Sequence, residues 1–446
     1  DRRAPAGRRH GRDRVGARSG VVELLVESSH ELPLVAFSVT LQAGCLYEPP
    51  GYDGLARICA RMLRRGAGEM SAEDIEQRAD ALGAEIGVGV GLGASTVSCE
   101  VLGRNLDEAV DLVAQLLGAP RFEEDELGRL VRQTRAELVR SRDEDSLLCS
   151  RALRRHLFDG HPHRRRAQGS LTGLGQIDVA TTRRFHRERF HRGGAIVAVA
   201  GDVDEKRAQS LADRLLGPLP AGAPEAYPAG EPPRPSARRL VVVDKPGRTQ
   251  TQMAIGTLGT HPRDEDHVPL TVANTAFGGT FTSRLVQAIR SERGWSYSTS
   301  SHLTSSRVRE AFSIWAAPAA EHAGPCLALA LELFERFVDD GIDAEELSFC
   351  QSYLRRSWAF EVDTAKKRLQ QRIERRLLDL PDDYHERFVE RVEATSLDQA
   401  NAAVRERLSP KDLWVSVVAS NAELGATLAD AIGDVAEHAV DPYDLE

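Results

Sequence analysis

The segment from Gly278 to Tyr297 contains the residues whose types and spacing are best suited to chemistry. It opens with two glycines, Gly278 and Gly279, and apolar residues then follow at helical spacing: Leu285, Val286 and Ile289. This pattern predicts a short helix that carries Arg290 near its C-terminal end and stops at Gly294. Tyr297 would begin a Ser/Thr-rich strand. A guanidinium and a phenol placed in this way can reach into one groove.

An arginine and a tyrosine in one groove could bind a peptide carbonyl and stabilise a developing oxyanion. The alternative is that Arg290 is an ordinary surface cation, since the dipole of a helix favours positive charge at its C-terminal end. The local pattern leaves both interpretations open, and the rest of the chain has to decide between them.

The composition is that of a globular protein of several domains, with 446 residues, 41% of them hydrophobic and 28% charged. A net charge of -9 argues against a nucleic-acid partner, because a protein needs a basic surface to bind the phosphate groups. No run approaches the roughly 18 apolar residues of a membrane span. The six cysteines are scattered without a C-x-x-C pair, which predicts small buried side chains and neither disulfides nor a zinc site.

The chain contains an internal repeat. A predicted strand pair, 21–27 and 35–43, is joined by a turn, and a similar pair recurs at 240–243 and 251–257. Matching residues lie 215 to 220 positions apart: Gly44 and Gly259, Ile177-Asp178 and Leu397-Asp398, Val199 and Val417. A nearly constant offset indicates a tandem duplication.

The duplication predicts an α+β fold with two homologous domains, 20–220 and 237–446. Each would have a mostly antiparallel sheet with helices packed on one face. Residues 221–236 contain five prolines and are predicted to form a semi-extended linker. Residues 1–19 are rich in Arg, Gly and Ala without periodicity, and we expect them to be a mobile N-terminal arm.

A duplicated unit with a Gly-Gly turn and an Arg…Tyr segment in its second copy resembles the pitrilysin/insulinase family of zinc peptidases. It is most similar to the short, processing-peptidase-type members, in which two such chains close as a clamshell. The family's first domain carries H-x-x-E-H on a helix that follows Gly-Leu-Ala, and a distant Glu completes the zinc site. The resemblance implies that a peptide is held by Arg290 and Tyr297, near the turn formed by Gly278 and Gly279.

The corresponding helix reads Gly54-Leu-Ala-Arg57-Ile-Cys-Ala60-Arg61, so both His positions are Arg and the general-base position is Ala60. A guanidinium has no lone pair for a metal, and we therefore expect no metal in this chain. Glu137 matches the third ligand position. We expect it to pair with Arg57 and Arg61; the alternative is an exposed helical carboxylate.

The remaining histidines offer no second metal site. His156, His161 and His163 straddle a Gly/Pro loop, which we expect to be solvated. The resemblance also implies that a peptide binds along the strand 85–93, through residues such as Glu85, Gly87 and Gly89. In this chain that edge could be vestigial or could hold one end of the peptide.

Together with the lost zinc ligands, the resemblance therefore implies the non-metal-binding subunit of a heterodimeric zinc endopeptidase. Its partner would be a homologous H-x-x-E-H chain that contributes the zinc, and its substrate a peptide or unfolded polypeptide. The alternative is an inert structural or peptide-presenting subunit of a larger assembly. We expect a soluble protein, for which both the bacterial cytoplasm and the periplasm remain open.

Overall fold

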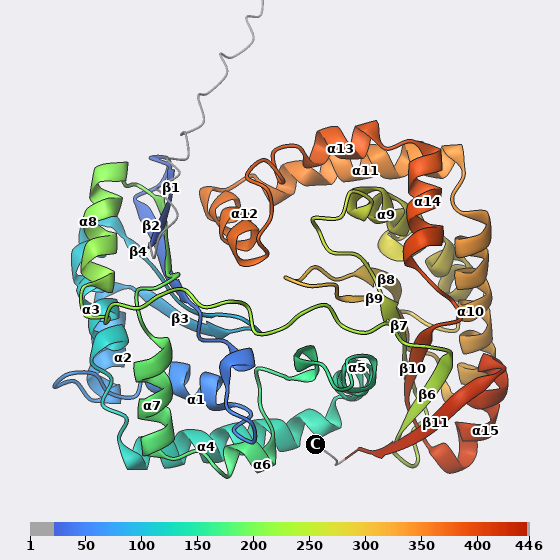
Figure 1. Cartoon of the computed structure of the whole chain (residues 1–446), viewed down its shortest axis with the longest axis horizontal. Coiled ribbons are helices and arrows are strands. Elements are labelled where there is room, and N and C mark those ends of the chain that lie inside the picture. The colour runs from blue at the N-terminus through green and yellow to red at the C-terminus, as the bar shows by residue number, and fades with distance from the viewer. Residues whose placement is uncertain (1–21, 444–446) are drawn as a thin grey trace, which may run out of the picture.

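The computed structural model describes residues 22–443, so the predicted N-terminal arm lies outside the described residues. Two β-sheets lie on opposite sides of the molecule, each with helices on its outer side (Figure 1). The first sheet has the strand order β1-β5-β2-β4-β3. Its strands are β1 (Glu23–Ser28), β2 (Leu34–Leu41), β3 (Glu85–Val90), β4 (Ser95–Leu102) and β5 (Ile196–Gly201).

The second sheet repeats this order and adds one strand. Its order is β11-β6-β10-β7-β9-β8, so β6, β10, β7, β9 and β8 take the places of β1, β5, β2, β4 and β3. Its strands are β6 (Arg238–Asp244), β7 (Gln252–Leu258), β8 (Thr299–Leu303), β9 (Ala311–Ala316), β10 (Leu413–Ala419) and β11 (Val435–Pro442). The shared topology confirms the duplication, and most strand pairs in both sheets are antiparallel.

The expected pairing of the two opening strands is wrong. β1 and β2 are neighbours in sequence, but β5 lies between them, parallel to β1 and antiparallel to β2. The reason is burial: residues 196–200 form an unbroken apolar run, and this strand is covered on both faces. In the second half β10 separates β6 from β7 in the same way.

Late in each half, the structural alignment of the two repeats differs from the alignment predicted from the sequence. The N-cap residues of two matching helices are Asp178 and Ser396, and each forms a capping box. These caps are equivalent in the fold, so Asp178 corresponds to Ser396 and the predicted match of Asp178 to Asp398 is displaced by two residues.

The helices of the first half pack mainly on the outer face of its sheet. They are α1 (Leu55–Met62), α2 (Ala72–Leu82), α3 (Leu106–Gly118), α4 (Glu124–Arg140), α5 (Asp145–Leu157), α6 (Leu171–Leu174), α7 (Val179–Arg189) and α8 (Glu205–Leu216). The second half contains α9 (His267–Asn274), α10 (Ala323–Asp340), α11 (Ala344–Glu361), α12 (Ala365–Leu377), α13 (Phe388–Ala394), α14 (Leu397–Arg407) and α15 (Asn421–Ile432). All six cysteines are buried and unpaired, as predicted.

Two helices cross from one half to the other. α5 belongs to the first half but packs on β6, β7 and β10 of the second sheet. α12 belongs to the second half but packs on β1 and β5 of the first sheet. Each sheet therefore has a second, inner face that is covered by a helix of the other half, and these contacts form two separate apolar clusters.

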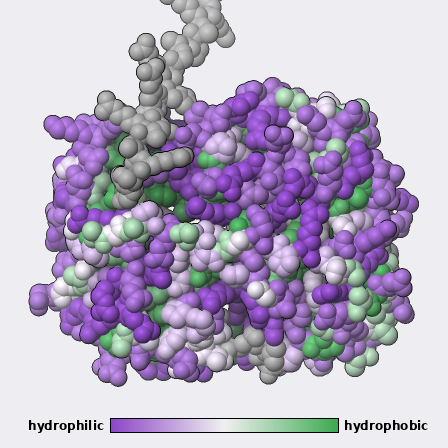
Figure 2. Space-filling view, viewed as in Figure 1, coloured by the Kyte–Doolittle hydropathy of each residue, from purple (hydrophilic) through white to green (hydrophobic). Residues whose placement is uncertain are grey.

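Residues 221–236 form no helix or strand and run between the two halves across the middle of the molecule (Figure 1). Among the described residues, no helix is long and apolar enough to cross a membrane. The face in view is mostly hydrophilic, with small, separated hydrophobic areas (Figure 2).

Candidate functional site

The degenerate motif lies on α1, where two arginines share one carboxylate. Arg57 and Arg61 are one helical turn apart on the polar side of this helix, and both reach Glu137 on α4. Arg57 Nη2 donates to Glu137 Oε2 at 3.0 Å, and Arg61 donates through Nη1 and Nη2 to Oε2 and Oε1 at 3.1 Å each. The expected ion pairs are therefore present. Ala60 is fully buried.

Burial and charge oppose each other at this cluster. Partial burial raises the pKa of Glu137, but hydrogen bonds from Arg61 and the charges of Arg61 and Arg57 outweigh it, so the pKa lies below its ordinary value. Burial and the neighbouring Arg61 charge lower the pKa of Arg57, and Glu137 compensates only in part. Two cations thus face one anion.

These residues do not fit a zinc ion. Arg57 and Arg61 have no lone pairs, and the Glu137 carboxylate already accepts four hydrogen bonds, three from the arginines and one from Gln133 at 3.1 Å. A carboxylate offers about four acceptor positions, so none is left for a metal. Within residues 22–443 no group of three or more His, Cys, Asp and Glu side chains could hold a metal ion.

A buried carboxyl group supports the start of α1. Glu48 Oε1 accepts hydrogen bonds from the backbone N–H groups of Gly54 and Ala56 at 3.1 and 2.8 Å. Gly54, at φ +105°, has a backbone conformation that favours glycine. Burial raises the pKa of Glu48 to about 8, against the lowering effect of these two N–H donors. No feature of the sequence pattern singled out Glu48.

Arg290 lies between two exposed aromatic rings. Its Cζ atom is 4.1 Å from the ring centroid of Tyr297 and 4.4 Å from that of Phe281. The exposed fractions of Tyr297 and Phe281 are 79% and 66%. Among the described residues, no hydrogen bond or ion pair engages the Arg290 guanidinium, and no hydrogen bond engages the Tyr297 hydroxyl. The cation is held by ring faces while its N–H donors stay available. Phe281 is not among the predicted site residues, since nothing in the sequence pattern marks it.

The backbone around Arg290 differs from the prediction in two respects. The helical segment Val286–Ser291 is a π-helix, a rare form that is frequent at functional sites. Gly294 ends the segment at φ +65°, as predicted, and its N–H donates to Arg290 O at 3.0 Å. Tyr297 is not on a strand, because β8 begins only at Thr299. The Ser296 hydroxyl instead accepts from Ala317 N and donates to Ser298 O, both at 2.8 Å, which fixes a turn before the strand.

The two glycines of the turn have different surroundings. Gly278 is buried against β8, and a Cβ atom there would lie 2.3 Å from Ser301 Oγ and 2.6 Å from Ser301 N. This close approach of the backbone explains the glycine by packing. Gly279 is exposed and ends a second π-helical turn, Thr275–Gly279.

The predicted peptide-binding strand is β3, the edge strand of the first sheet. Glu85 and Gly89 are exposed, and Gly87 is half-buried. These residues point to one face of the strand, and the side chains of Val88 and Val90 point to the other. β3 also lies next to α1, so the sheet edge and the Arg57/Arg61 cluster are adjacent.

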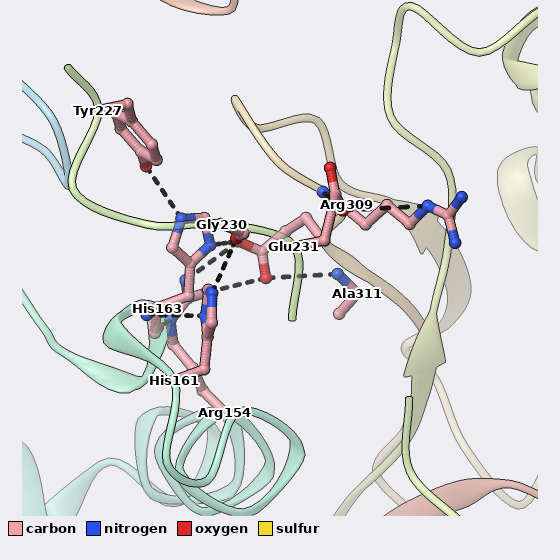
Figure 3. Close-up of polar contacts among 9 residues, drawn as sticks. Arg154, His161, His163, Tyr227, Gly230, Glu231, Arg309 and Ala311 are labelled. Atoms are coloured by element: carbon pink, nitrogen blue, oxygen red, sulfur yellow. Dashed lines mark hydrogen bonds and ion pairs between the residues drawn. The ribbon is translucent and has the colours of Figure 1, made fainter. Parts of the chain in front are cut away.

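The expectation of a solvated histidine loop is wrong for His161 and His163, which are both buried. His163 Nδ1 lies 3.2 Å from Glu310 Oε2, and its Nε2 lies 2.9 Å from the Tyr227 hydroxyl (Figure 3). Arg154 on α5 pairs with Glu310 through both terminal nitrogens, at 3.3 and 3.1 Å. This group joins the first half, the segment 221–236 and the second half. Sequence spacing alone could not find it, because its members come from three distant segments.

The structure thus brings together two separate sets of predicted residues. Arg57, Arg61 and Glu137 meet in the first half, and Arg290 and Tyr297 meet in the second.

Comparison with known proteins places both halves in one family. Residues 23–169 match the profile described as Insulinase (Peptidase family M16), and residues 176–354 match the Peptidase M16 inactive domain. A relative from Helicobacter pylori, named "Non-peptidase homolog YmxG", is 22% identical over 403 residues, which cover 90% of this chain and 92% of the relative.

Solved structures show the same fold. The peptidase M16 inactive domain from Pseudomonas fluorescens superposes with a TM-score of 0.84 at 24% identity, over 90% of this chain and 96% of that one. The periplasmic protease PqqL from Escherichia coli superposes with a TM-score of 0.75 at 16% identity, over 94% of this chain but only 49% of its own length. The chain belongs to peptidase family M16, and residues 176–354 match the family's inactive domain.

Proposed function

We propose that this chain is the non-metal-binding subunit of a heterodimeric zinc endopeptidase. Its partner is an M16 chain with an intact H-x-x-E-H motif, which contributes zinc, the water and the general base. This chain contributes Arg290 and Tyr297, which contact the carbonyl groups of a bound peptide and the oxyanion that forms at the partner's zinc.

One observation carries the proposal. Arg290 is fixed between Phe281 and Tyr297 with its N–H donors unengaged within the described residues, beside an exposed phenol. A surface arginine that served only solubility or stability would be expected to point into water or to pair with a carboxylate. The coverage of half of PqqL supports pairing, since in that protease a unit of this size is followed or preceded by another part of similar length.

The competing function is that of an inert structural or peptide-presenting subunit. The name of the Helicobacter pylori relative and the description of the profile matched by residues 176–354 favour it, since neither implies catalysis. The Arg290 guanidinium, unengaged within the described residues, and the exposed Tyr297 favour the catalytic proposal.

The test is turnover of an unfolded peptide by the purified chain, alone and mixed with an H-x-x-E-H homologue from the same genome. We expect activity that requires the partner's motif and increases when this chain is added. Arg290→Ala and Tyr297→Phe should each lower turnover in the mixture by about 10²–10³, as the loss of one oxyanion donor does.

Arg293→Ala is the matched control, because Arg293 lies on the same turn and pairs with Glu292 on the surface. Peptide hydrolysis by this chain alone would refute the divided site. If the Arg290→Ala and Tyr297→Phe variants both form a stable complex with the partner and keep full turnover, the catalytic proposal is wrong. The structural or peptide-presenting function would then remain.

A further inference from the structure

A recess lined by four arginines lies beside the free edge of the first sheet. Its volume is about 720 Å³, and its lining includes Arg57, Arg61, Arg64, Arg65, Val88 and Val90. The arginines follow one another at helical spacing on one side of α1 and of the turn after it. The opposite side of α1 is buried in the core, and all four arginines lie on the other side, where they line the recess.

The recess carries more positive than negative charge. Arg57 and Arg61 share Glu137, and Arg64 pairs with Glu76 at 2.8 Å. Arg65 reaches Glu126 only at 4.0 Å, and this carboxylate is held more closely by Arg129, at 2.5 Å. Five arginines therefore share three carboxylates in these ion pairs.

Donors remain for a further anion. Arg57 makes a single hydrogen bond among the described residues, so most of its five N–H groups lack a protein acceptor. The side chains of Arg57 and Arg65 are 29% and 39% exposed, and both can reach a ligand from solution. Since a guanidinium stays charged at any physiological pH, this surplus is permanent.

The neighbouring strand indicates what kind of molecule would bring the anion. β3 has no partner on one side, and the Ile86 carbonyl accepts from Arg64 Nη1 at 2.8 Å on that side. In an antiparallel ladder alternate residues direct their N–H and C=O groups the same way, so those of Val88 and Val90 also point to the free edge. A peptide that adds as a strand here would lie across the opening of the arginine recess.

We propose that the recess binds a carboxylate of an acidic peptide that lies along β3. The inference deepens the proposed function, on which it rests for the presence of a peptide at this edge, and names the class of substrate. The carboxylate would come from an Asp or Glu side chain or from the peptide's C-terminus. The forked guanidinium groups of Arg57 and Arg65 would bind it through paired N–H···O bonds.

The test uses the whole chain without a partner. Four fluorescently labelled peptides of alternating Val and Thr carry either Glu or Gln at the centre, each with a free or an amidated C-terminus. Fluorescence anisotropy at low salt should give about tenfold tighter binding for the peptide with a carboxylate at the recognised position, since hydrogen bonds to charged groups are the stronger ones. Discrimination between Glu and Gln would assign the side chain, and discrimination between acid and amide the C-terminus.

Arg57→Gln combined with Arg65→Gln should reduce this discrimination to less than about twofold. The substitutions leave Glu137 paired with Arg61, and the thermal transition should show that the variant is folded. Arg78→Gln is the matched control. Arg78 lies on the exposed side of α2, where it pairs with Glu108 of α3, and it is not part of the recess lining. If the double variant does not fold, Arg65→Gln alone provides the test.

Equal binding of all four peptides, or no binding of any, would overturn the inference, as would full discrimination in a folded Arg57→Gln/Arg65→Gln variant. The outcome is separable from that of the proposed function, because binding is measured without turnover. Carboxylate discrimination without activity in the mixture would leave this inference standing while the proposed function failed.

Discussion

At the scale of single residues, Arg57 and Arg61 change what α1 can bind. Imidazole nitrogens at these positions would offer lone pairs to a metal, whereas guanidinium groups offer only N–H donors. Glu137 is kept, but its acceptor positions are filled by those donors. The residues at these positions therefore cannot ligate a cation, and their N–H groups are suited to hydrogen bonds with an anion.

Glu48 gives a prediction of pH dependence. Its folded-state pKa of about 8 lies above the ordinary value of 4.5, so the folded protein binds more protons than the unfolded chain between these values. Stability contributed by Glu48 therefore falls as the pH rises through this window. Relative to the Glu48→Gln variant, the free energy of unfolding of the wild type should fall by a few kcal/mol as the pH rises through this window. The upper limit is about 1.4 kcal/mol for each unit of pKa shift.

Urea unfolding of both proteins between about pH 5 and pH 8.5 measures this difference. Glu69→Gln is a suitable control, since Glu69 is exposed. The free energy of unfolding of this variant should change with pH in the same way as that of the wild type. A difference between wild type and Glu48→Gln that does not change with pH would contradict the assignment.

At the scale of elements, the most consequential feature is the exchange of α5 and α12. α5 can approach the second sheet because β7 carries Gly256 at the contact. A Cβ atom on Gly256 would lie 2.8 Å from Leu153 Cδ1 and 2.9 Å from its Cδ2. The glycine thus makes room for a leucine of the other half.

This contact predicts a non-additive pair of substitutions. Leu153→Ala should lower the free energy of unfolding by roughly 2–5 kcal/mol, because it removes buried methyl groups and leaves a cavity. Gly256→Ala should also destabilise, through overlap with Leu153. In the double variant the new methyl group occupies part of the cavity. The decrease in its free energy of unfolding should therefore be smaller than the sum of the decreases in the two single variants.

Chemical denaturation of the three variants measures the coupling. Val139→Ala on α4 serves as the control, since this side chain is 46% exposed and its truncation should have little effect. Strictly additive losses would show that Leu153 and Gly256 do not share one space.

Local sequence signals predicted most elements well and failed where a distant contact decides the backbone. Ser71 and Asp74 form the predicted capping box at the start of α2, because both partners lie within one turn. The sequence predicts that Tyr297 lies on a strand, but β8 begins only at Thr299, after a turn that is held by a hydrogen bond from Ala317 N to Ser296 Oγ. That donor lies 21 residues away, beyond the reach of any local pattern.

At the scale of the whole molecule, the two halves are joined by apolar and polar contacts. α12 contributes ion pairs to β1, where Arg368 lies 2.7 Å from Glu27 and Arg376 pairs with Glu23. The second junction is the group of Arg154, His163, Tyr227 and Glu310, in which His163 and Glu310 are buried (Figure 3). These contacts predict that the halves unfold together.

Glu310→Gln tests this junction. Burial raises the pKa of Glu310, but the hydrogen bond from His163 and the charge of Arg154 outweigh it, so the pKa lies below its ordinary value. The stabilisation is therefore present above the ordinary carboxyl pKa and is lost as the pH falls through the lowered one. At pH 7 the substitution should cost roughly 3 kcal/mol, since it leaves the Arg154 charge without its partner.

Calorimetry at pH 7 measures both the loss and the cooperativity. The wild type should unfold in a single transition, and Glu310→Gln at a lower temperature. Glu321→Gln is the control, since the contact of Glu321 that the described part of the chain provides is a long surface one with His322, at 3.7 Å. A wild type with two well-separated transitions would contradict the coupling of the halves.

The sequence by itself determined the duplicated α+β fold, the family resemblance and the loss of zinc ligands. Each of these depends on residue identity and spacing along the chain: Arg at positions 57 and 61 cannot ligate a metal in any fold. Only the tertiary structure decided the place of β5 between β1 and β2, the exchange of α5 and α12, and the burial of His163 against Glu310. The physical reason is that burial and charge pairing depend on neighbours that are distant in sequence. The same reason applies to Arg290, whose surroundings depend on two aromatic rings that no local pattern places around it.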